Sequence, residues 1–545
     1  MNKVAHYLQE HVVGEVMTGT DARNYFSTDN SIFSITPSVI VYPKNENDVR
    51  KTARFAWQLA ERNRIIPITA RGSGTDLSGA ALGSGVMLAF PAHLNQVKFV
   101  DAKNGVVTVE AGINFGKLQQ LLLTYDRFVP AAPASLEYST VGGAVANNAS
   151  SIRSIKYGDM RHYVKGLRVV LSNGEVIETG KLSKKELNRK LGLATFEGEI
   201  YRAVDTLLEE NRELVEKSSL NVTKNATGYD LADVRSEDGS FDLTPLFVGS
   251  QGTLGLVTEV TLDSEPIGGD PVLITAHLDS VDALQSAVEE LRKLEESPSA
   301  LEVVDDNLLN LVSSLNANYL KDVIELPYPK FVLIVEFDSA KEHKQKKLVK
   351  QATKILSKLS QQVEVEEDTD KQEVLWKIRE SSAVVSGHNQ GQLNPLPLID
   401  DGIVPVDKLA TFINAVYSQF SREHLQVALW GHAGDGNLHV QPYLNLSQVG
   451  DRQKAFRMLE EYNRQVRDLG GSLSAQYNDG RLRGPYLDKL YPADVHALFQ
   501  KIKKIFDPYN ILNPGVKINV SLEEVKPLVR SSYSLDHIFD HLPLS

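Results

Sequence analysis

Three glycine-rich segments in the first half of this 545-residue chain most strongly limit what it can fold into. Residues 71–79 read RGSGTDLSG, residues 133–148 read PASLEYSTVGGAVANN, and residues 249–255 read GSQGTLG. Glycine permits positive φ and lets ligand atoms approach the backbone, and successive N–H groups in such turns bind anions such as a pyrophosphate. One such loop alone is typical of a tight turn in a β-rich protein. Three of them in order indicate an extended dinucleotide that lies across the backbone.

The spacing of the first loop argues against a Rossmann fold. Gly72, Gly74 and Gly79 read GxGxxxxG, whereas the Rossmann fingerprint is GxGxxG. Residues 80–90 are typical of a turn followed by a strand, not of the long helix that a Rossmann unit needs. The sequence therefore predicts a nucleotide site, but not NAD on a Rossmann fold.

Composition excludes several classes of function. The net charge is −12, which argues against non-specific binding to nucleic acid. The chain has no cysteine, which excludes disulfides, thiol catalysis and cysteine-bound iron–sulfur clusters. The first residues lack the apolar core of a secretory signal, and no apolar stretch approaches the roughly 20 residues that span a bilayer. We expect a cytoplasmic protein, with peripheral contact at the inner face of a membrane left open.

The first 265 residues read as one mixed α/β region that carries all three loops. A change of composition follows Leu262, and residues 266–271 (PIGGDP) form a natural linker. The strands expected before the linker are 37–43, 65–69, 106–111 and the hairpin 166–178, which turns at Asn-Gly. Helices are expected from Asn47 to Glu61 and over 114–125.

Strands and helices alternate after the linker. The expected strands are 272–277, 300–304, 331–337 and 362–366, and the expected helices are 281–294, 308–317 and 343–359. This pattern favours an α+β domain with a mostly antiparallel sheet. We predict domains over 1–265, 266–425 and 426–520, followed by a tail over 521–545 in which 533–542 is a candidate docking helix.

Residues 431–439, GHAGDGNLH, are the sharpest local signal for chemistry. Histidine is a common ligand of divalent transition metals, and the turn glycines let His432 and His439 converge on one point. Two partly buried histidines bonded to the backbone are the alternative. A metal site also needs a third ligand, which the order of residues does not supply.

Two further positions are candidates for the same site. Arg379 is the best candidate for holding an anionic substrate, because guanidinium binds a carboxylate through two hydrogen bonds. A salt bridge on a helix surface is its plainer interpretation. Asp400 and Asp401 precede a predicted strand and either face the same cavity or form an ordinary turn.

Six motifs in order give the chain a resemblance to a known family. They are the segments 71–79, 140–143 (TVGG), 156–158 (KYG), 249–255, 431–439 and 506–515 (FDPYNILNPG). The chain resembles the FAD-dependent D-2-hydroxyacid dehydrogenases, which include D-lactate dehydrogenases and the glycolate oxidase flavin subunit and have the vanillyl-alcohol-oxidase type of FAD fold. The similarity runs from about Pro37 to Lys517.

The resemblance implies an α+β fold in which a two-subdomain FAD-binding domain of the PCMH type precedes an antiparallel-sheet cap domain. It implies non-covalent FAD, because the first loop has no attachment histidine. The implied cofactor-binding residues are Arg71, Gly72, Ser73, Gly74, Thr75, Asp76, Pro133, Thr140, Gly142, Gly143, Asn147, Ala149, Tyr157, Gly252, Gly255, Val257 and Asn513.

The resemblance also implies the chemistry. In the family a hydride leaves the α-carbon of the substrate for the flavin while a base takes the hydroxyl proton. Arg379 matches the residue that grips the substrate carboxylate, and His432 and His439 match two metal-binding histidines. Residues 146–158 are similar to the branch that carries a fused iron–sulfur half. That half is absent, so the electrons must pass to a separate acceptor such as a quinone, a cytochrome or an electron-transfer protein.

One motif departs from the family. Where relatives have a glutamate and a histidine, residues 474–480 read SAQYNDG, so that Gln476 replaces the third metal ligand and Tyr477 replaces the expected base. An amide binds a divalent cation less well than a carboxylate because it lacks the charge. Tyrosine ordinarily has a pKa of about 10, which makes it a poor base at neutral pH. A lysine found before the Asp-Gly-type strand in some relatives is matched by Ile399.

Three outcomes therefore stay open. The main prediction is FAD-dependent oxidation of a small D-2-hydroxyacid such as D-lactate, in which Arg379 binds the carboxylate, His432 and His439 position the hydroxyl directly or through a divalent metal such as zinc, and Tyr477 accepts the proton or donates a hydrogen bond. The alternatives are an FAD-binding protein with altered or lost dehydrogenase activity and a different flavin reaction on the same fold.

Overall fold

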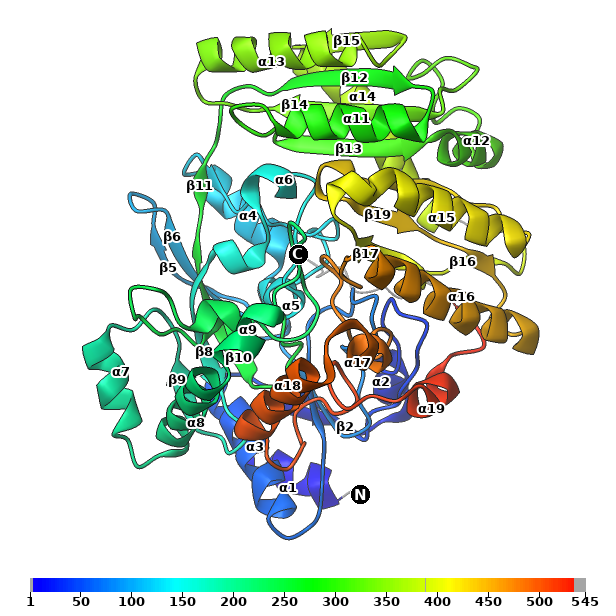
Figure 1. Ribbon diagram of the computed structural model, residues 1–545. Coiled ribbons are helices and arrows are strands. Elements are labelled where there is room, and N and C mark those ends of the chain that lie inside the picture. The colour runs from blue at the N-terminus through cyan, green and yellow to red at the C-terminus, as the bar shows by residue number, and fades with distance from the viewer. Residues whose placement is uncertain (1–2, 388, 534–545) are drawn as a thin grey trace.

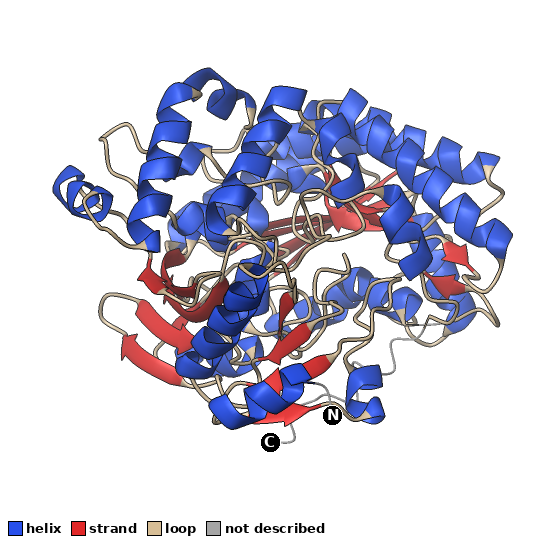
Figure 2. Cartoon of the chain, turned by 90° about the horizontal axis from the view of Figure 1, so that it is seen from below, coloured by secondary structure: helices blue, strands red, loops and turns tan. Residues whose placement is uncertain are grey.

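The fold is built around three larger sheets of four, five and seven strands (Figure 1). The computed structural model describes residues 3–387 and 389–533. Viewed at right angles to Figure 1, the larger share of the helices lies along one side of the strands (Figure 2). In Figure 1, strands β12 to β15 of the third sheet (between residues 272 and 366) lie at the top, and strands β2, β8, β9 and β10 of the first two sheets (between residues 39 and 263) lie in the lower part.

The four-stranded sheet has the order β1-β2-β4-β3, with β4 parallel to both of its neighbours. Its strands are β1 (Glu15–Met17), β2 (Val39–Tyr42), β3 (Ile68–Arg71) and β4 (Val86–Ala89). Helices α1 (Lys3–His11) and α3 (Glu46–Ala60) pack on it, and the Asn45 side chain caps α3 by accepting from the Asp48 N–H. Because β3 ends at Arg71, it delivers the chain directly into the first glycine segment.

The five-stranded sheet is antiparallel and places the other two glycine segments. Its order is β5-β6-β10-β8-β9, with bounds Val97–Asp101, Val106–Glu110, Leu256–Asp263, Val164–Val170 and Val176–Glu178. Along β10, buried and half-buried residues alternate, as expected for a strand with one face on the core. The helices that share this core are α4 (Phe115–Leu123), α5 (Val141–Asn147), α8 (Phe196–Glu210) and α18 (Ala493–Phe506).

The seven-stranded antiparallel sheet occupies the upper half of the molecule (Figure 1). In spatial order its strands are β15 (Gln362–Glu366), β12 (Val272–Leu278), β14 (Phe331–Phe337), β13 (Ala300–Asp305), β18 (Leu429–His432), β19 (Asn437–Val440) and β17 (Asp400–Ile403). Strands β18 and β19, which follow residue 425, thus join the sheet that begins at residue 272.

Both faces of this sheet are buried at β12, because neighbouring residues of this strand belong to different cores. Ile274 packs in the core formed with α11 (Val281–Arg292), α13 (Glu342–Leu356), α15 (Leu409–Arg422) and α16 (Val449–Asp468). Leu273 packs in the core formed with α12 (Asp306–Leu315) and α14 (Thr369–Ser386). Burial on both faces explains the long apolar runs in β12 and β14.

Shorter elements complete the chain. They are α2 (Thr20–Tyr25), β7 (Arg127–Phe128), α6 (Ser154–Tyr157), α7 (Lys184–Leu191), α9 (Arg212–Lys217), α10 (Thr244–Phe247), β11 (Glu265–Pro266), β16 (Asn394–Pro395), β20 (Tyr443–Leu444), α17 (Leu487–Leu490) and α19 (Leu522–Val525).

The expected elements are found with small shifts at their ends. The strand expected over 65–69 is β3, which begins at Ile68, where the backbone N–H bonds to the Ile511 carbonyl. The helix expected over 343–359 ends at Leu356. The candidate docking helix over 533–542 lies almost wholly outside the described residues.

Charged side chains join the two halves of the molecule. Arg153 forms two hydrogen bonds to Glu336 on β14, and Lys156 pairs with Asp338 at 2.6 Å. Tyr157 donates to the same Asp338 carboxylate at 2.7 Å. Helix α6, which carries Tyr157, lies directly below β13 in Figure 1. Within the described part of the chain, no helix has the length and apolar character needed to cross a bilayer.

Candidate functional site

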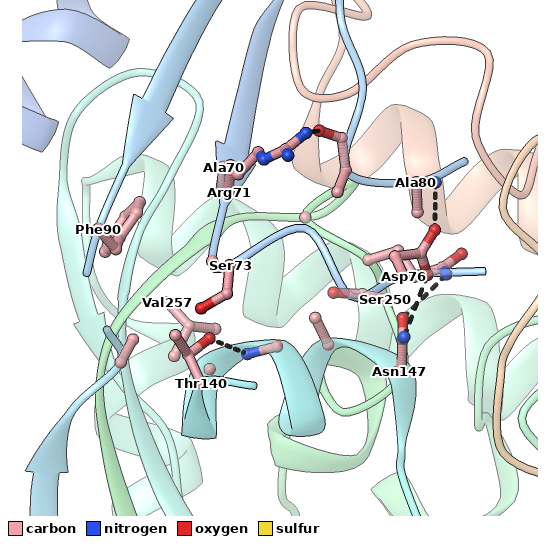
Figure 3. Close-up of a pocket in the computed structure, with 18 of the residues that line it drawn as sticks. Ala70, Arg71, Ser73, Asp76, Ala80, Phe90, Thr140, Asn147, Ser250 and Val257 are labelled. Atoms are coloured by element: carbon pink, nitrogen blue, oxygen red, sulfur yellow. Dashed lines mark hydrogen bonds between the residues drawn. The ribbon is translucent and has the colours of Figure 1, made fainter. Parts of the chain in front are cut away.

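A cavity lies where the three glycine segments meet (Figure 3). About 860 Å³ of space lies between its walls, and this volume includes solvent at the open part of the cavity. Its walls come from segments far apart in the sequence, and the lining residues are Ala70–Asp76, Ala80, Ala81, Phe90, Ala111, Thr140, Gly142, Gly143, Ala146, Asn147, Phe247, Ser250–Gly252, Gly255 and Val257.

Hydrogen bonds hold the first glycine loop against the second. The Asp76 carboxylate accepts from the Ser78 and Ala80 N–H groups at 3.0 and 2.8 Å, which folds the loop back on itself. Asn147 at the end of α5 donates to the same carboxylate at 3.1 Å (Figure 3). Thr140 caps α5 by accepting from the Gly143 N–H. The shape of the cavity is therefore fixed by side chains that also line it.

The cavity fits an extended dinucleotide such as FAD. At Gly142 a Cβ would lie 2.7 Å from the Ala111 carbonyl oxygen, so only glycine allows this close packing of the second loop. Gly252 has φ +70°, and a Cβ there would meet nothing within 4 Å, so its backbone faces open space. The buried Arg71 Nη2 has no hydrogen-bond partner among the described residues, which leaves a donor at the edge of the site.

Most of the expected cofactor residues line this cavity, and four do not. Arg71 to Asp76, Thr140, Gly142, Gly143, Asn147, Gly252, Gly255 and Val257 are in its wall. Tyr157 instead bonds to Asp338 across the two halves, and Asn513 donates to the Ala80 and Gln251 carbonyls, which braces two loops from behind. Pro133 and Ala149 also lie outside the lining. The motif spacing located the loops, but not which side of each loop faces the cavity.

A second polar cluster forms on the hairpin of β18 and β19. His432 ends β18 and His439 lies in β19, with ring centroids 5.2 Å apart. Gly436, at φ +75°, makes the turn, and a Cβ there would lie 2.2 Å from the Val404 carbonyl oxygen. The glycines therefore let the hairpin fold tightly enough for the two imidazoles to face each other.

Each imidazole is held by a buried carboxylate rather than by the backbone. His432 Nδ1 lies 2.7 Å from Glu302 Oε1, and His439 Nδ1 lies 2.6 Å from Asp400 Oδ1. Glu302 is on β13 beside β18, and Asp400 pairs directly with His439 across β17 and β19. The neighbouring Asp401 accepts from the Gln476 and Tyr477 N–H groups, which holds the segment of the altered motif beside the hairpin.

Gln476 lies between the two imidazoles. Its Nε2 is 3.2 Å from His432 Nε2 and 3.3 Å from His439 Nε2, and its Oε1 is 2.7 Å from Ser150 Oγ. The ring of Tyr477 lies 5.5 Å from that of His439. Among the described residues, no group of three or more His, Cys, Asp or Glu side chains could hold a metal ion.

The electrostatics of this cluster favour an ionised Glu302 carboxylate and a neutral His432 ring. Burial raises the pKa of Glu302, but the attraction of His432 and Arg379 and their hydrogen bonds outweigh it and lower that pKa to about 2. Burial lowers the pKa of His432 to about 4, against the opposing effect of Glu302. At neutral pH, His432 is therefore a neutral ring whose Nδ1–H donates to Glu302.

The phenol of Tyr477 is kept protonated. Burial, followed by the nearby Asp400 and Asp401 carboxylates, raises its pKa well above 10. Both effects disfavour a phenolate, because it would be a partly desolvated negative charge beside two carboxylates. The arrangement thus favours Tyr477 as a hydrogen-bond donor over Tyr477 as a proton acceptor.

Arg379 joins this cluster from helix α14. Its Nε donates to Glu302 Oε2 at 2.7 Å, so that one carboxylate holds both Arg379 and His432. Its Nη1 donates to Ser382 Oγ at 3.2 Å, and the side chain is 12% exposed. It is therefore not a surface salt bridge but a cation at the edge of the histidine cluster. Two of its five N–H donors are engaged in these bonds.

Sequence reasoning missed three buried members of the cluster: Glu302, Lys224 and Ser150. Glu302 is fully buried in the apolar strand β13. An acidic residue in such a strand indicates a buried side chain that pairs with it. Lys224 Nζ donates to Ser150 Oγ at 2.9 Å and Ser154 Oγ at 3.0 Å. Both contacts join distant segments, so no local spacing reveals them.

Two solved structures are similar to this chain in fold. The chain aligns with 4-ethylphenol oxidase from Gulosibacter chungangensis at a TM-score of 0.67 and 14% identity, over 96% of this chain and 97% of that one. An alkyldihydroxyacetonephosphate synthase aligns at a TM-score of 0.63 and 16% identity, over 94% of this chain and 86% of that one. At such identities the likeness concerns the fold alone.

Sequence relatives are similar over most of this chain. D-2-hydroxyglutarate dehydrogenase of Pantoea ananatis (strain AJ13355) is 29% identical over 520 residues, which are 92% of this chain and 50% of that protein. Glycolate oxidase subunit GlcD of Bacillus subtilis (strain 168) is 27% identical over 88% of both chains. D-lactate dehydrogenase of Anaerostipes hadrus is 25% identical over 92% of this chain and 94% of that one. The chain spans about half the length of the D-2-hydroxyglutarate dehydrogenase it matches.

Two family models match consecutive parts of the chain. The FAD binding domain matches residues 37–180, which hold the first two glycine segments, and the C-terminal domain of FAD linked oxidases matches residues 270–516, which hold Arg379, both histidines and Gln476. The chain therefore belongs to the FAD-linked oxidases, in which an FAD-binding domain precedes an FAD-linked oxidase C-terminal domain.

Proposed function

We propose that the protein is an FAD-linked oxidoreductase that oxidises a small D-2-hydroxyacid, with D-lactate as the model substrate, to the 2-oxoacid. The observation that carries this proposal is the carboxylate of Glu302, which holds Arg379 on one oxygen and His432 on the other. A cation suited to a substrate carboxylate thus lies beside an imidazole suited to a hydroxyl. The names of the sequence relatives support the same class of substrate.

The protein would bind FAD non-covalently in the cavity of the three glycine segments, and FAD would supply a hydride acceptor for the α-carbon of the substrate. Arg379 would bind the substrate carboxylate through the N–H donors that Glu302 and Ser382 do not use. This contact fixes one end of the substrate and directs its hydroxyl toward the histidine pair.

The hydroxyl proton would pass to an imidazole. His432 and His439 each direct Nδ1 at a carboxylate, so each presents the Nε2 lone pair on the side of Gln476. To reach that lone pair, the substrate hydroxyl must replace a Gln476 N–H. Tyr477, whose raised pKa keeps it protonated, would donate a hydrogen bond to the substrate rather than take its proton.

Electrons would leave for a separate acceptor, such as a quinone, a cytochrome or an electron-transfer protein. The absence of cysteine from the chain supports this part of the proposal, because cysteine-ligated iron–sulfur clusters cannot form within it. A dye-linked assay therefore suits the protein.

Anaerobic titration of the FAD-loaded protein with D-lactate, L-lactate, glycolate and D-2-hydroxyglutarate tests the proposal. Loss of the oxidised flavin absorbance with a D-acid and not with its L-enantiomer is expected. Unchanged absorbance with every acid would overturn the proposed oxidation.

Gln476 and Tyr477 favour a second candidate, an FAD-binding protein with altered or lost dehydrogenase activity. The double variant Q476E/Y477H, which restores the residues of the resembled family, separates the two. If the natural protein bleaches with a D-acid, the first proposal holds. If only the double variant does, the second holds.

A further inference from the structure

We propose that the side-chain amide of Gln476 takes the place of a metal ion between His432 and His439, so that this site works without a divalent cation. The inference concerns the site of the proposed function. The test of this inference measures metal content, so failure of the inference is distinguishable from the absence of D-2-hydroxyacid oxidation.

Lys224 sets the direction of the first hydrogen bond, because an ammonium group can only donate hydrogen bonds. Lys224 is 5% exposed, and its Nζ lies 2.9 Å from Ser150 Oγ, so the serine oxygen accepts from the lysine. The hydroxyl hydrogen of Ser150 must then go to its other partner, Gln476 Oε1, at 2.7 Å. The atom of Gln476 that faces Ser150 is therefore the carbonyl oxygen, and the NH₂ group faces the histidines.

The two carboxylates at the other end of this hydrogen-bond network indicate the same orientation of the Gln476 amide. Glu302 accepts from Arg379, and Asp400 Oδ1 accepts from the Asp401 N–H at 2.7 Å, so both carboxylates act as acceptors. The Nδ1 atoms of His432 and His439 must therefore carry the hydrogens that point at them. Each imidazole then turns an Nε2 lone pair toward Gln476.

Donors and acceptors between the three side chains match in number. The NH₂ group of Gln476 has two hydrogens, and two lone pairs lie 3.2 and 3.3 Å from its nitrogen. The bonds run in one direction from Lys224 through Ser150 and Gln476 to the two rings, and then to the two carboxylates. Gln476 is 8% exposed, so an orientation of its amide without these hydrogen bonds would leave buried polar atoms without partners.

A divalent cation does not fit this arrangement. It would need lone pairs from every ligand, whereas Gln476 presents the positive ends of two N–H bonds to the point where such an ion would sit. To offer its oxygen the amide must turn over, which would set its NH₂ group against the hydroxyl hydrogen of Ser150. The described residues contain no group of three His, Cys, Asp or Glu side chains that could hold the ion instead.

Gln476 is thus a positioning residue. It fixes the tautomers of both rings and holds their lone pairs toward one point, which is the role that a metal would otherwise have. A substrate hydroxyl that displaces one N–H meets a ring already oriented to accept its proton.

The metal content of the FAD-loaded wild-type protein, measured by inductively coupled plasma mass spectrometry after dialysis with a chelator, is the first test. We expect no divalent ion in stoichiometric amount, and unchanged flavin absorbance and melting temperature before and after dialysis. A retained ion that is lost in the H432N/H439N variant would overturn the proposal. A retained ion that persists in that variant lies elsewhere and would support a metal-free histidine site.

The Q476E variant is the second test. A carboxylate completes a His-His-Glu ligand set, so calorimetric titration with Zn²⁺ should show about one added ion per chain, at least about 10-fold tighter than for wild type. The matched control is Q476E/H439N, which keeps the new carboxylate, removes one ring and should lose the gain. Equal Zn²⁺ affinity in wild type and Q476E would contradict the inference, and the wild-type measurement still decides if Q476E does not fold.

Discussion

The side-chain amide of Asn478 donates a 2.8 Å hydrogen bond to the carbonyl oxygen of Gly249, and it also reaches the Asn147 carbonyl at 3.2 Å. In the reverse direction, Gln251 accepts from the Gly480 N–H at 2.8 Å. The segment that carries Gln476 and Tyr477 is thereby fixed to the loops of the glycine-lined cavity. These hydrogen bonds between distant parts of the chain thus help to set the distance between the histidine cluster and that cavity.

Replacement of Arg379 by lysine should impair substrate binding while leaving the cofactor in place. Lysine keeps the charge but cannot bond to Glu302 and to a carboxylate in one plane. We expect kcat/KM for the D-acid to fall about 100-fold, with FAD affinity unchanged. The control is R457K, which alters a surface pair with Glu423 and should leave kcat/KM as in wild type. Equal kcat/KM in R379K and wild type would exclude Arg379 from substrate binding.

The G142A variant should weaken FAD binding. The added Cβ would lie 2.7 Å from the Ala111 carbonyl oxygen, so the second glycine loop or its neighbour must move. We expect the dissociation constant for FAD, measured by flavin fluorescence, to rise by about 10-fold or more. In the G450A control the new Cβ meets nothing within 4 Å, and FAD affinity should not change. Equal affinities in both variants would count against the cavity as the FAD site.

Stability should fall as pH rises because of Asp29. Burial, with repulsion from Asp76, raises the pKa of Asp29 from 3.8 to about 7. Between these values the folded protein binds a proton that the unfolded chain does not, so the free energy of unfolding decreases as pH rises through this window. In D29N this loss should be smaller, as chemical denaturation at pH about 5 and about 8 would measure. If wild type and D29N lose the same free energy of unfolding between these pH values, Asp29 is not the group responsible.

Removal of the Lys224 charge should destabilise the protein. Its Nζ lies 3.4 Å from Asp435 Oδ2, and the two side chains are 2% and 3% exposed. In K224M the buried carboxylate loses its cation, and we expect the free energy of unfolding to fall by about 3 kcal/mol. K489M removes an exposed pair with Glu460 and should change it by less than about 0.5 kcal/mol. A K224M protein as stable as K489M would contradict the role given to this pair.

The sequence was sufficient for the elements and the loops, because both depend on local pattern. The pattern of apolar residues predicted β12 and α11 to within two residues at each end, and glycine spacing found the three segments of the cavity. Such reasoning does not reach contacts between distant segments. The motif predicts Tyr157 as a cofactor residue, and its hydroxyl also donates to Asp338, 181 positions away, which no local pattern indicates.

Contacts between distant parts of the chain could not be predicted from the sequence. The partners of His432 and Gln476 are Glu302 and Ser150, which no spacing connects to them. The sequence did identify Gln476 and Tyr477 as unusual, but the orientation of the amide follows from the donor-only lysine behind Ser150.

The most direct measurement is the visible spectrum of the purified protein, reconstituted with FAD and titrated anaerobically with D-lactate and D-2-hydroxyglutarate. We expect a yellow protein whose oxidised flavin absorbance disappears on addition of a D-2-hydroxyacid and returns with an artificial electron acceptor. A folded protein that takes up no FAD, or one whose bound flavin no D-2-hydroxyacid reduces, would contradict this expectation.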